Sequence, residues 1–145
     1  MHLSYDGEDR ERLWDYAKDN NIIGLSHRDV NDNWTKVREK AKNLIGKGWV
    51  RQFDTFCGMQ KGDIVMVFHG MDSVLGVART TESRHEYDKK TGDVFFDHFR
   101  RVGWIRKYDY SGRKMLPKLL EGFSHTLSRV TSSSPRWDML TNLDF

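Results

Sequence analysis

The chain has 145 residues, the usual length of one domain, and its single cysteine, Cys57, excludes an internal disulfide and most zinc-site patterns. Charged residues make up 31% of the sequence, but the formal net charge is only +3, which is a mild cationic bias. No apolar run approaches the roughly 18 residues that a membrane helix needs, and no secretory segment is recognisable. We therefore expect one cytoplasmic domain over residues 1–145, without a cofactor, in which about 131–145 form a docked or flexible tail.

The first part of the chain predicts helices around one short strand. Apolar residues at helical spacing alternate with loop-forming polar stretches, and acidic residues occupy the first turn of the first helix. The predicted elements are a helix over 8–19, a strand over 22–26, a loop over 27–33 and helices over 34–45 and 50–57. We expect Gly46 and Gly48 to end the second helix and Gly58 to end the third.

The pattern then changes to strands. Residues 63–70 and 74–80 are β-branched and aromatic runs around a turn, which predicts two antiparallel strands, with a bulge or a close backbone approach at Gly76. The further expectations are a third strand over 80–87, a charged turn over 89–93, one or two strands over 94–108 and an amphipathic segment after Pro117. The predicted fold class is therefore α+β: a small curled β-barrel of about five to six strands flanked by two to four short helices.

Basic and aromatic residues alternate through the strands after residue 79, an arrangement suited to a polyanion. The predicted phosphate-binding residues are Arg79, Arg84, Lys89, Lys90, Arg100 and Arg101. A set of solvated strand faces would give the same pattern. Of the five tryptophans, Trp34, Trp49 and Trp104 lie near predicted element ends, where an indole ring can stack on a base; packing in the core is the alternative for each ring.

Catalytic motifs are absent from the sequence. The six histidines are scattered without a metal-ligand spacing, and neither a GxSxG elbow nor a GxxxxGK[ST] loop occurs. We expect neither a metal site nor an enzyme. The rival hypothesis is a small nucleic-acid-cleaving enzyme with His69, His98 or Asp97 as acid and base, but no spacing forces any two of these side chains together.

The order of short motifs between residues 13 and 106 resembles the PUA-like superfamily in its EVE form, including the N-terminal domains of McrB-type modification-dependent restriction systems. The matching pieces are Ile23-Gly24-Leu25, Lys61-Gly62-Asp63, Gly76 and Val102-Gly103-Trp104. Leu25 stands where that family often has tryptophan, so one wall of an aromatic cage is missing. The resemblance implies a pocket at the mouth of the barrel that accepts a base rotated out of a duplex.

The residues expected to line this base pocket are Ser26, Trp34, Trp49, Phe53, His69, Tyr87 and Trp104. The resemblance implies a non-catalytic domain that recognises a modified base in DNA and targets a restriction complex, fused to or assembled with a GTPase or nuclease. Three alternatives stay open: an RNA-binding PUA-like domain, the small enzyme, and a protein-interaction module that uses the aromatic residues.

Overall fold

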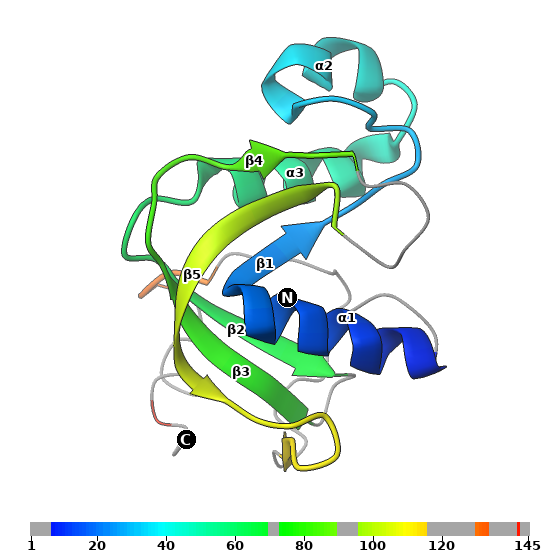
Figure 1. The fold of residues 1–145 in the computed structure, drawn as a ribbon. Coiled ribbons are helices and arrows are strands. Elements are labelled where there is room, and N and C mark those ends of the chain that lie inside the picture. The colour runs from blue at the N-terminus through cyan, green and yellow to red at the C-terminus, as the bar shows by residue number, and fades with distance from the viewer. Residues whose placement is uncertain (1–6, 70–72, 90–95, 116–129, 134–141, 143–145) are drawn as a thin grey trace.

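The computed structural model describes residues 7–69, 73–89, 96–115, 130–133 and 142. The elements of this part of the chain are α1 (Gly7–Asn20), β1 (Ile22–Leu25), α2 (Trp34–Ala41), α3 (Gly46–Gly58), β2 (Ile64–His69), β3 (Ser73–Thr80), β4 (Glu86–Tyr87), β5 (His98–Lys107) and β6 (Lys114–Met115). The strands form one curled antiparallel sheet, a half-barrel with three helices around it, which confirms the predicted α+β class (Figure 1).

The long strand β5 connects all parts of the sheet. Its first half pairs with β1 on one edge and with β4 on the other, and its second half pairs with β3, which in turn pairs with β2 and β6. In Figure 1 this strand curves from the end of the molecule that carries α3 to the end that carries β3. Any surface along β5 therefore passes from the helical end of the domain to the sheet end.

The core lies between α1, α3 and the inner face of the sheet. Leu13, Trp14 and Ala17 of α1 are buried, as the helical spacing predicted. Gly76 of β3 confirms both expectations for its position: Leu75 beside it is the extra residue of a bulge in the β2–β3 ladder, and a β-carbon at position 76 would stand 2.8 Å from the Trp14 ring and 2.9 Å from the Trp104 ring. A side chain larger than hydrogen would separate these two indoles from the strand.

Several predicted boundaries are wrong. The helix expected over 34–45 ends at Ala41, and turns lead from there to Ile45; Leu44, expected on the apolar face of this helix, is 62% exposed, whereas Ile45 is buried. Gly46 has φ of +75°, the left-handed value that ends a helical turn, yet α3 starts at this residue, so Gly46 and Gly48 belong to the third helix.

The strand boundaries also differ from those expected. The strand predicted over 80–87 is confined to Glu86 and Tyr87, because residues 81–85 form no ladder. Within the described part of 94–108, one continuous strand replaces the one or two expected. The turn at 70–72, most of the charged turn and the segment 116–129 lie outside the described residues. None of the helices in the described part is long and apolar enough to cross a membrane.

Candidate functional site

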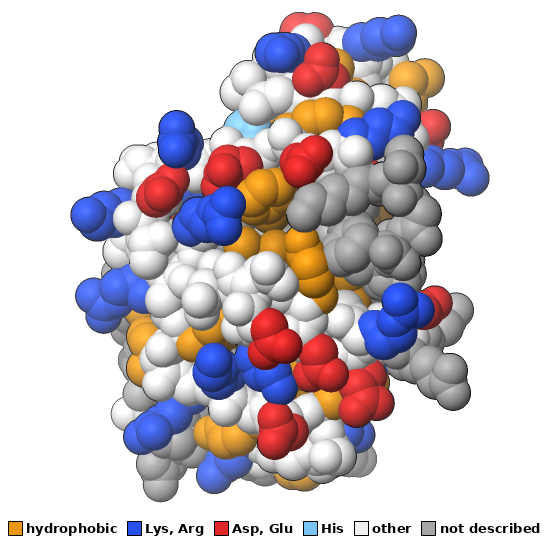
Figure 2. All heavy atoms as spheres, viewed as in Figure 1, with side chains coloured by type: hydrophobic (Ala, Val, Ile, Leu, Met, Phe, Trp, Pro, Cys, Tyr) orange, Lys and Arg blue, Asp and Glu red, His pale blue; other side chains and the backbone are white. Residues whose placement is uncertain are grey.

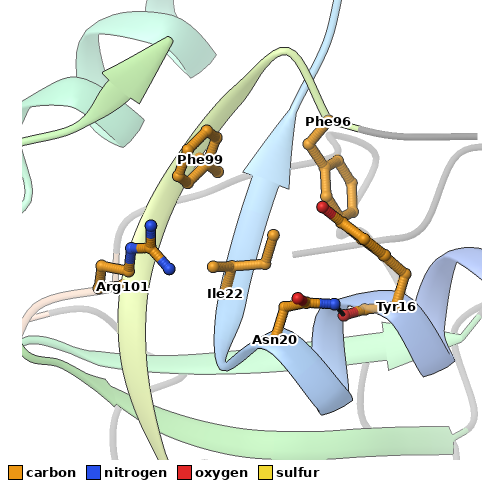
Figure 3. A pocket seen from close by; sticks show the side chains of 6 residues that line it. All are labelled: Tyr16, Asn20, Ile22, Phe96, Phe99 and Arg101. Atoms are coloured by element: carbon orange, nitrogen blue, oxygen red, sulfur yellow. Dashed lines mark hydrogen bonds between the residues drawn. The ribbon is translucent and has the colours of Figure 1, made fainter. Parts of the chain in front are cut away.

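A groove of about 160 Å³ opens on the outer side of β1 and β5, next to α1 (Figure 3). Its walls come from three separate segments of the chain, and three of its side chains are aromatic. The lining residues are Tyr16 and Asn20 of α1, Ile22 of β1, Phe96 just before β5, and Phe99 and Arg101 of β5. In Figure 2, hydrophobic side chains appear near the centre of this face, over β1 and β5, and Lys and Arg side chains follow its left edge.

Strand alternation determines which residues of β5 face the groove. His98 and Arg100 point inward and are fully buried, so Phe99 and Arg101 point to the opposite side. Across the ladder, Ile22 pairs with Arg101 and therefore shares its face. The groove thus follows from the register between the first strand and the longest one.

The polar groups of the groove are held in place by their neighbours. The Asn20 side chain donates to the backbone oxygen of Tyr16 at 2.8 Å. The Nε of Arg101 donates to Glu86 at 3.0 Å, and the Arg101 guanidinium carbon lies 5.3 Å from the centroid of the Phe99 ring. The side-chain oxygen of Asn20 and the two terminal nitrogens of Arg101 remain to bind polar edges of a ligand. A flat ligand would therefore meet aromatic walls, one acceptor and a fork of donors.

Most of the predicted base-pocket residues lie in a different place, around the buried ring of His98 at the helical end of β5. The Phe53 ring stacks on Trp34 with centroids 4.8 Å apart and touches His98 edge-on at 5.0 Å. Tyr87 lies 4.9 Å from His98, and Trp49 lies 6.3 Å from Phe53. We call these five residues the His98 cluster. Ser26 follows β1 nearby, and its hydroxyl accepts a hydrogen bond from the Asp97 amide.

Burial changes the interpretation of the His98 cluster. Trp34 is 2% exposed and its indole N–H donates to Asp54 at 2.8 Å, while Phe53 is fully buried. The prediction that these two rings form an open slot for a base is therefore wrong in this structure: they join α2 to α3 as core. Trp49 and Tyr87 are half-buried at the margin of the cluster.

His69 and Trp104, the remaining predicted pocket residues, are far from the His98 cluster along the sheet. His69 at the end of β2 contacts Tyr110 edge-on, with centroids 5.2 Å apart. Trp104 contacts Trp14 edge-on at 5.1 Å, on the core side of β5. The structure therefore does not bring all seven predicted residues into one pocket.

The five predicted phosphate-binding residues that the structure describes divide into three groups. Arg79 and Lys89 are exposed, and Arg84 and Arg101 are exposed but pair with Glu82 and Glu86. Lys90 lies outside the described residues. The third group is Arg100 alone.

The prediction that Arg100 binds phosphate is wrong, because its side chain is fully buried and cannot reach a phosphate. Its guanidinium donates to the backbone oxygens of Phe56, Cys57, Met59 and Glu82 at 2.8–3.3 Å. This side chain joins the end of α3 to the loop after β3, which is a structural role.

Burial shifts the pKa of three titratable groups near the core, His98, Cys57 and Asp97. Burial lowers the pKa of His98 to about 4 and raises the pKa of the Cys57 thiol to about 12, so the ring is neutral and the thiol is protonated. Burial also raises the pKa of Asp97. Among the described residues, no three His, Cys, Asp or Glu side chains are placed to hold a metal ion.

Five of the six groove residues were not predicted from the sequence; only Arg101 was, as a phosphate ligand. The available signal was the alternation of Phe99 and Arg101 on β5, which puts an aromatic and a cation on one face. Tyr16 and Asn20 gave no such signal, because a helical face near a strand becomes a wall only once the packing angle of α1 is known.

Comparison with known proteins assigns the chain to a family. A family model described as a domain of unknown function (DUF8426) matches residues 2–124. This is most of the sequence, so the chain belongs to this family. Neither a curated protein nor a solved structure matches the chain.

Proposed function

We propose that this member of the DUF8426 family is a non-catalytic nucleic-acid-binding domain that holds one base, rotated out of a DNA duplex, in the groove between α1, β1 and β5. The observation that carries the proposal is the lining of this groove, in which Tyr16, Phe96 and Phe99 provide aromatic walls and Arg101 provides donors. The sequence resemblance to EVE-type domains supports a modified base as the ligand and a role in targeting a restriction complex.

The size of the groove supports a base with a single ring as the ligand. A dry cavity of about 150 Å³ is enough to bind benzene, and this groove measures about 160 Å³. A pyrimidine therefore fits better than the fused rings of a purine. Stacking on aromatic side chains contributes about 1–3 kcal/mol per base, which offsets much of the few kcal/mol that extrusion from the stack costs.

The groove also offers polar contacts that suit a base edge. Asn20 can accept a hydrogen bond from an exocyclic amino group through its side-chain oxygen, and the Arg101 nitrogens can donate to a ring nitrogen or carbonyl oxygen. The Glu86 pair and the Phe99 ring hold the guanidinium beside the groove before a ligand arrives, which lowers the entropic cost of binding. These features support binding without chemistry on the base.

The test is a titration of labelled DNA duplexes that differ at one position: cytosine, 5-methylcytosine, 5-hydroxymethylcytosine or N6-methyladenine. We expect one modified pyrimidine to bind tightest. The variant Phe99→Leu, which keeps an apolar side chain but removes the ring, should lose about tenfold or more of this preference. Competition with RNA of the same sequence distinguishes the two nucleic acids.

The matched control is Tyr87→Leu, which removes a half-buried ring from the His98 cluster. It should keep the preference for the modified base. If Tyr87→Leu removes the preference and Phe99→Leu does not, the base lies in the other cluster and the groove is not the site. If no duplex binds below about 100 µM at about 50 mM salt, nucleic-acid binding itself is refuted, because even non-specific binders reach that range.

A further inference from the structure

An exposed patch of two isoleucines and two arginines lies on the outer face of the sheet where β2, β3 and β5 meet. Ile64 and Ile105 are each 51% exposed, unusual for large aliphatic side chains, and Arg79 and Arg106 are exposed beside them. We call these four residues the Ile–Arg face. The groove and the His98 cluster contain none of them.

The sheet register brings the four residues together. Ile64 of β2 is paired with Arg79 of β3, and Arg79 is paired with Gly103 of β5, whose missing side chain leaves the surface flat. A bulge follows in β5: Trp104 pairs with Ala78 and Arg106 pairs with Val77, so Ile105 is the extra residue. Its insertion lets two successive side chains face outward.

The other side of the bulge supports this orientation. Trp104 points inward, where its ring contacts Trp14, so the outward direction remains for the neighbours Ile105 and Arg106. Both are exposed, in agreement with this direction. The bulge therefore interrupts the regular alternation of side chains along β5 and places Ile105 and Arg106 side by side on the surface.

The two arginines also differ from others on the sheet in their pairing. Arg84 and Arg101 pair with Glu82 and Glu86, whereas within the described part no ion pair or hydrogen bond joins the side chain of Arg79 or Arg106 to another residue. Two unpaired cations beside exposed isoleucines suit a partner that presents both negative charge and apolar surface. DNA does so along its minor groove, where phosphates flank sugars and base edges.

We propose that the Ile–Arg face is a second contact to duplex DNA, in which Ile64 and Ile105 lie against sugars and base edges and Arg79 and Arg106 bind the flanking phosphates. This inference rests on the proposed function and adds to it the surface that holds the duplex while the groove holds the base. Strand β5 joins the two sites, because Phe99 and Arg101 line the groove and the same outer face continues through Gly103 to Ile105.

The experiment measures the affinity of a fluorescein-labelled DNA duplex, with and without the preferred modified base, over a series of salt concentrations. The double variant R79Q/R106Q should weaken both duplexes equally and reduce the slope of log K against log salt by about 2, one for each lost phosphate contact. The double variant I64T/I105T, which keeps β-branched side chains, should weaken binding about tenfold without changing the slope. K40Q/K47Q, on two exposed lysines of α2 and α3, is the charge-matched control and should leave both quantities unchanged.

The outcomes separate this inference from the function on which it rests. If R79Q/R106Q and I64T/I105T both bind DNA like the wild-type protein, while Phe99→Leu still loses the preference for the modified base, the proposed role of the Ile–Arg face is refuted and that of the groove is not. If the wild-type protein binds no duplex, both the proposed function and this inference are refuted. If sedimentation shows a dimer that I64T/I105T dissociates, and DNA affinity is unchanged, the face binds a second copy of the chain and the inference is wrong.

Discussion

The ring of Phe96 occupies the space that a side chain at Gly24 would need: a β-carbon at position 24 would lie 1.9 Å from Cγ of Phe96. Gly24 sits in β1 opposite Phe99, so this contact places one aromatic wall of the groove beside another. The Ile23-Gly24-Leu25 motif, one of the short pieces matched in the sequence, therefore also shapes the candidate site.

The substitution Gly24→Ala should displace Phe96 and damage the groove. We expect the free energy of unfolding to fall by about 1–3 kcal/mol, as for other overpacked sites, and the preference for a modified base to weaken. Urea denaturation and duplex titration measure the two effects. Gly103→Ala is the control for stability, because a β-carbon there lies 3.8 Å from Thr81, an ordinary contact; equal losses for both variants would contradict the explanation.

Removing the Arg100 guanidinium should destabilise the whole domain. Arg100→Gln leaves most of the four carbonyl oxygens at the end of α3 and in the following loops without a donor, and we expect a loss of about 3 kcal/mol. Arg100→Lys should recover part of this stability, since an ammonium group retains the charge but not the fork. Denaturation of Arg79→Gln, an exposed arginine, is the comparison; a similar loss there would show that the burial of Arg100 does not matter.

Stability should depend on pH through His98. Its pKa is about 4 in the folded protein and 6.5 ordinarily, so the unfolded chain takes up the proton first as the pH falls. The stability from the neutral ring is therefore fully present above pH 6.5 and decreases between about 6.5 and 4, by about 3 kcal/mol in total. His85, whose pKa burial also lowers, adds in the same direction.

Urea denaturation at a series of pH values tests this dependence. His98→Gln should flatten the profile in that range, although it lowers stability at pH 7. Carbon-detected NMR of the imidazoles gives the folded pKa directly. A His98 ring that titrates near 6.5 would overturn the prediction.

The thiol of Cys57 should react slowly while the protein is folded. Its pKa is raised to about 12, mainly by burial, so little thiolate exists at pH 8. We expect alkylation by iodoacetamide to be at least about a hundredfold slower than in urea, where the thiol has its ordinary pKa. Equal rates in the two states would mean that the side chain is accessible and the cause assigned here is wrong.

Local patterns in the sequence were enough to predict most helices and strands and the class of fold. The spacing of Leu13, Trp14 and Ala17 predicted α1, and the β-branched runs predicted β2 and β3, because these periods follow from helix and strand geometry alone. The end of α2 could not be predicted in this way, since the apolar spacing of the sequence continues to Ile45, and Ile45 is buried although turns replace the helix after Ala41.

The site was harder to predict, because its walls depend on contacts between distant segments. Arg100 and Arg101 are adjacent and chemically identical, yet one supports the core and the other faces the groove. Only the register between β1 and β5 decides which is which. Trp34 was expected beside a base for a related reason: an aromatic ring at an element end gives no sign of whether another helix will cover it, and here Phe53 of α3 stacks on it.

The position of β5 also has a consequence for synthesis on the ribosome. Trp14 in the first helix bonds to the backbone oxygen of Tyr108, 94 positions later, and β1 gains its ladder partner only when β5 has emerged. Until then the apolar side of α1 and the edge of β1 lie open to other nascent chains. Contacts so distant in sequence fold slowly, which makes this interval the moment when a chaperone would benefit the protein most.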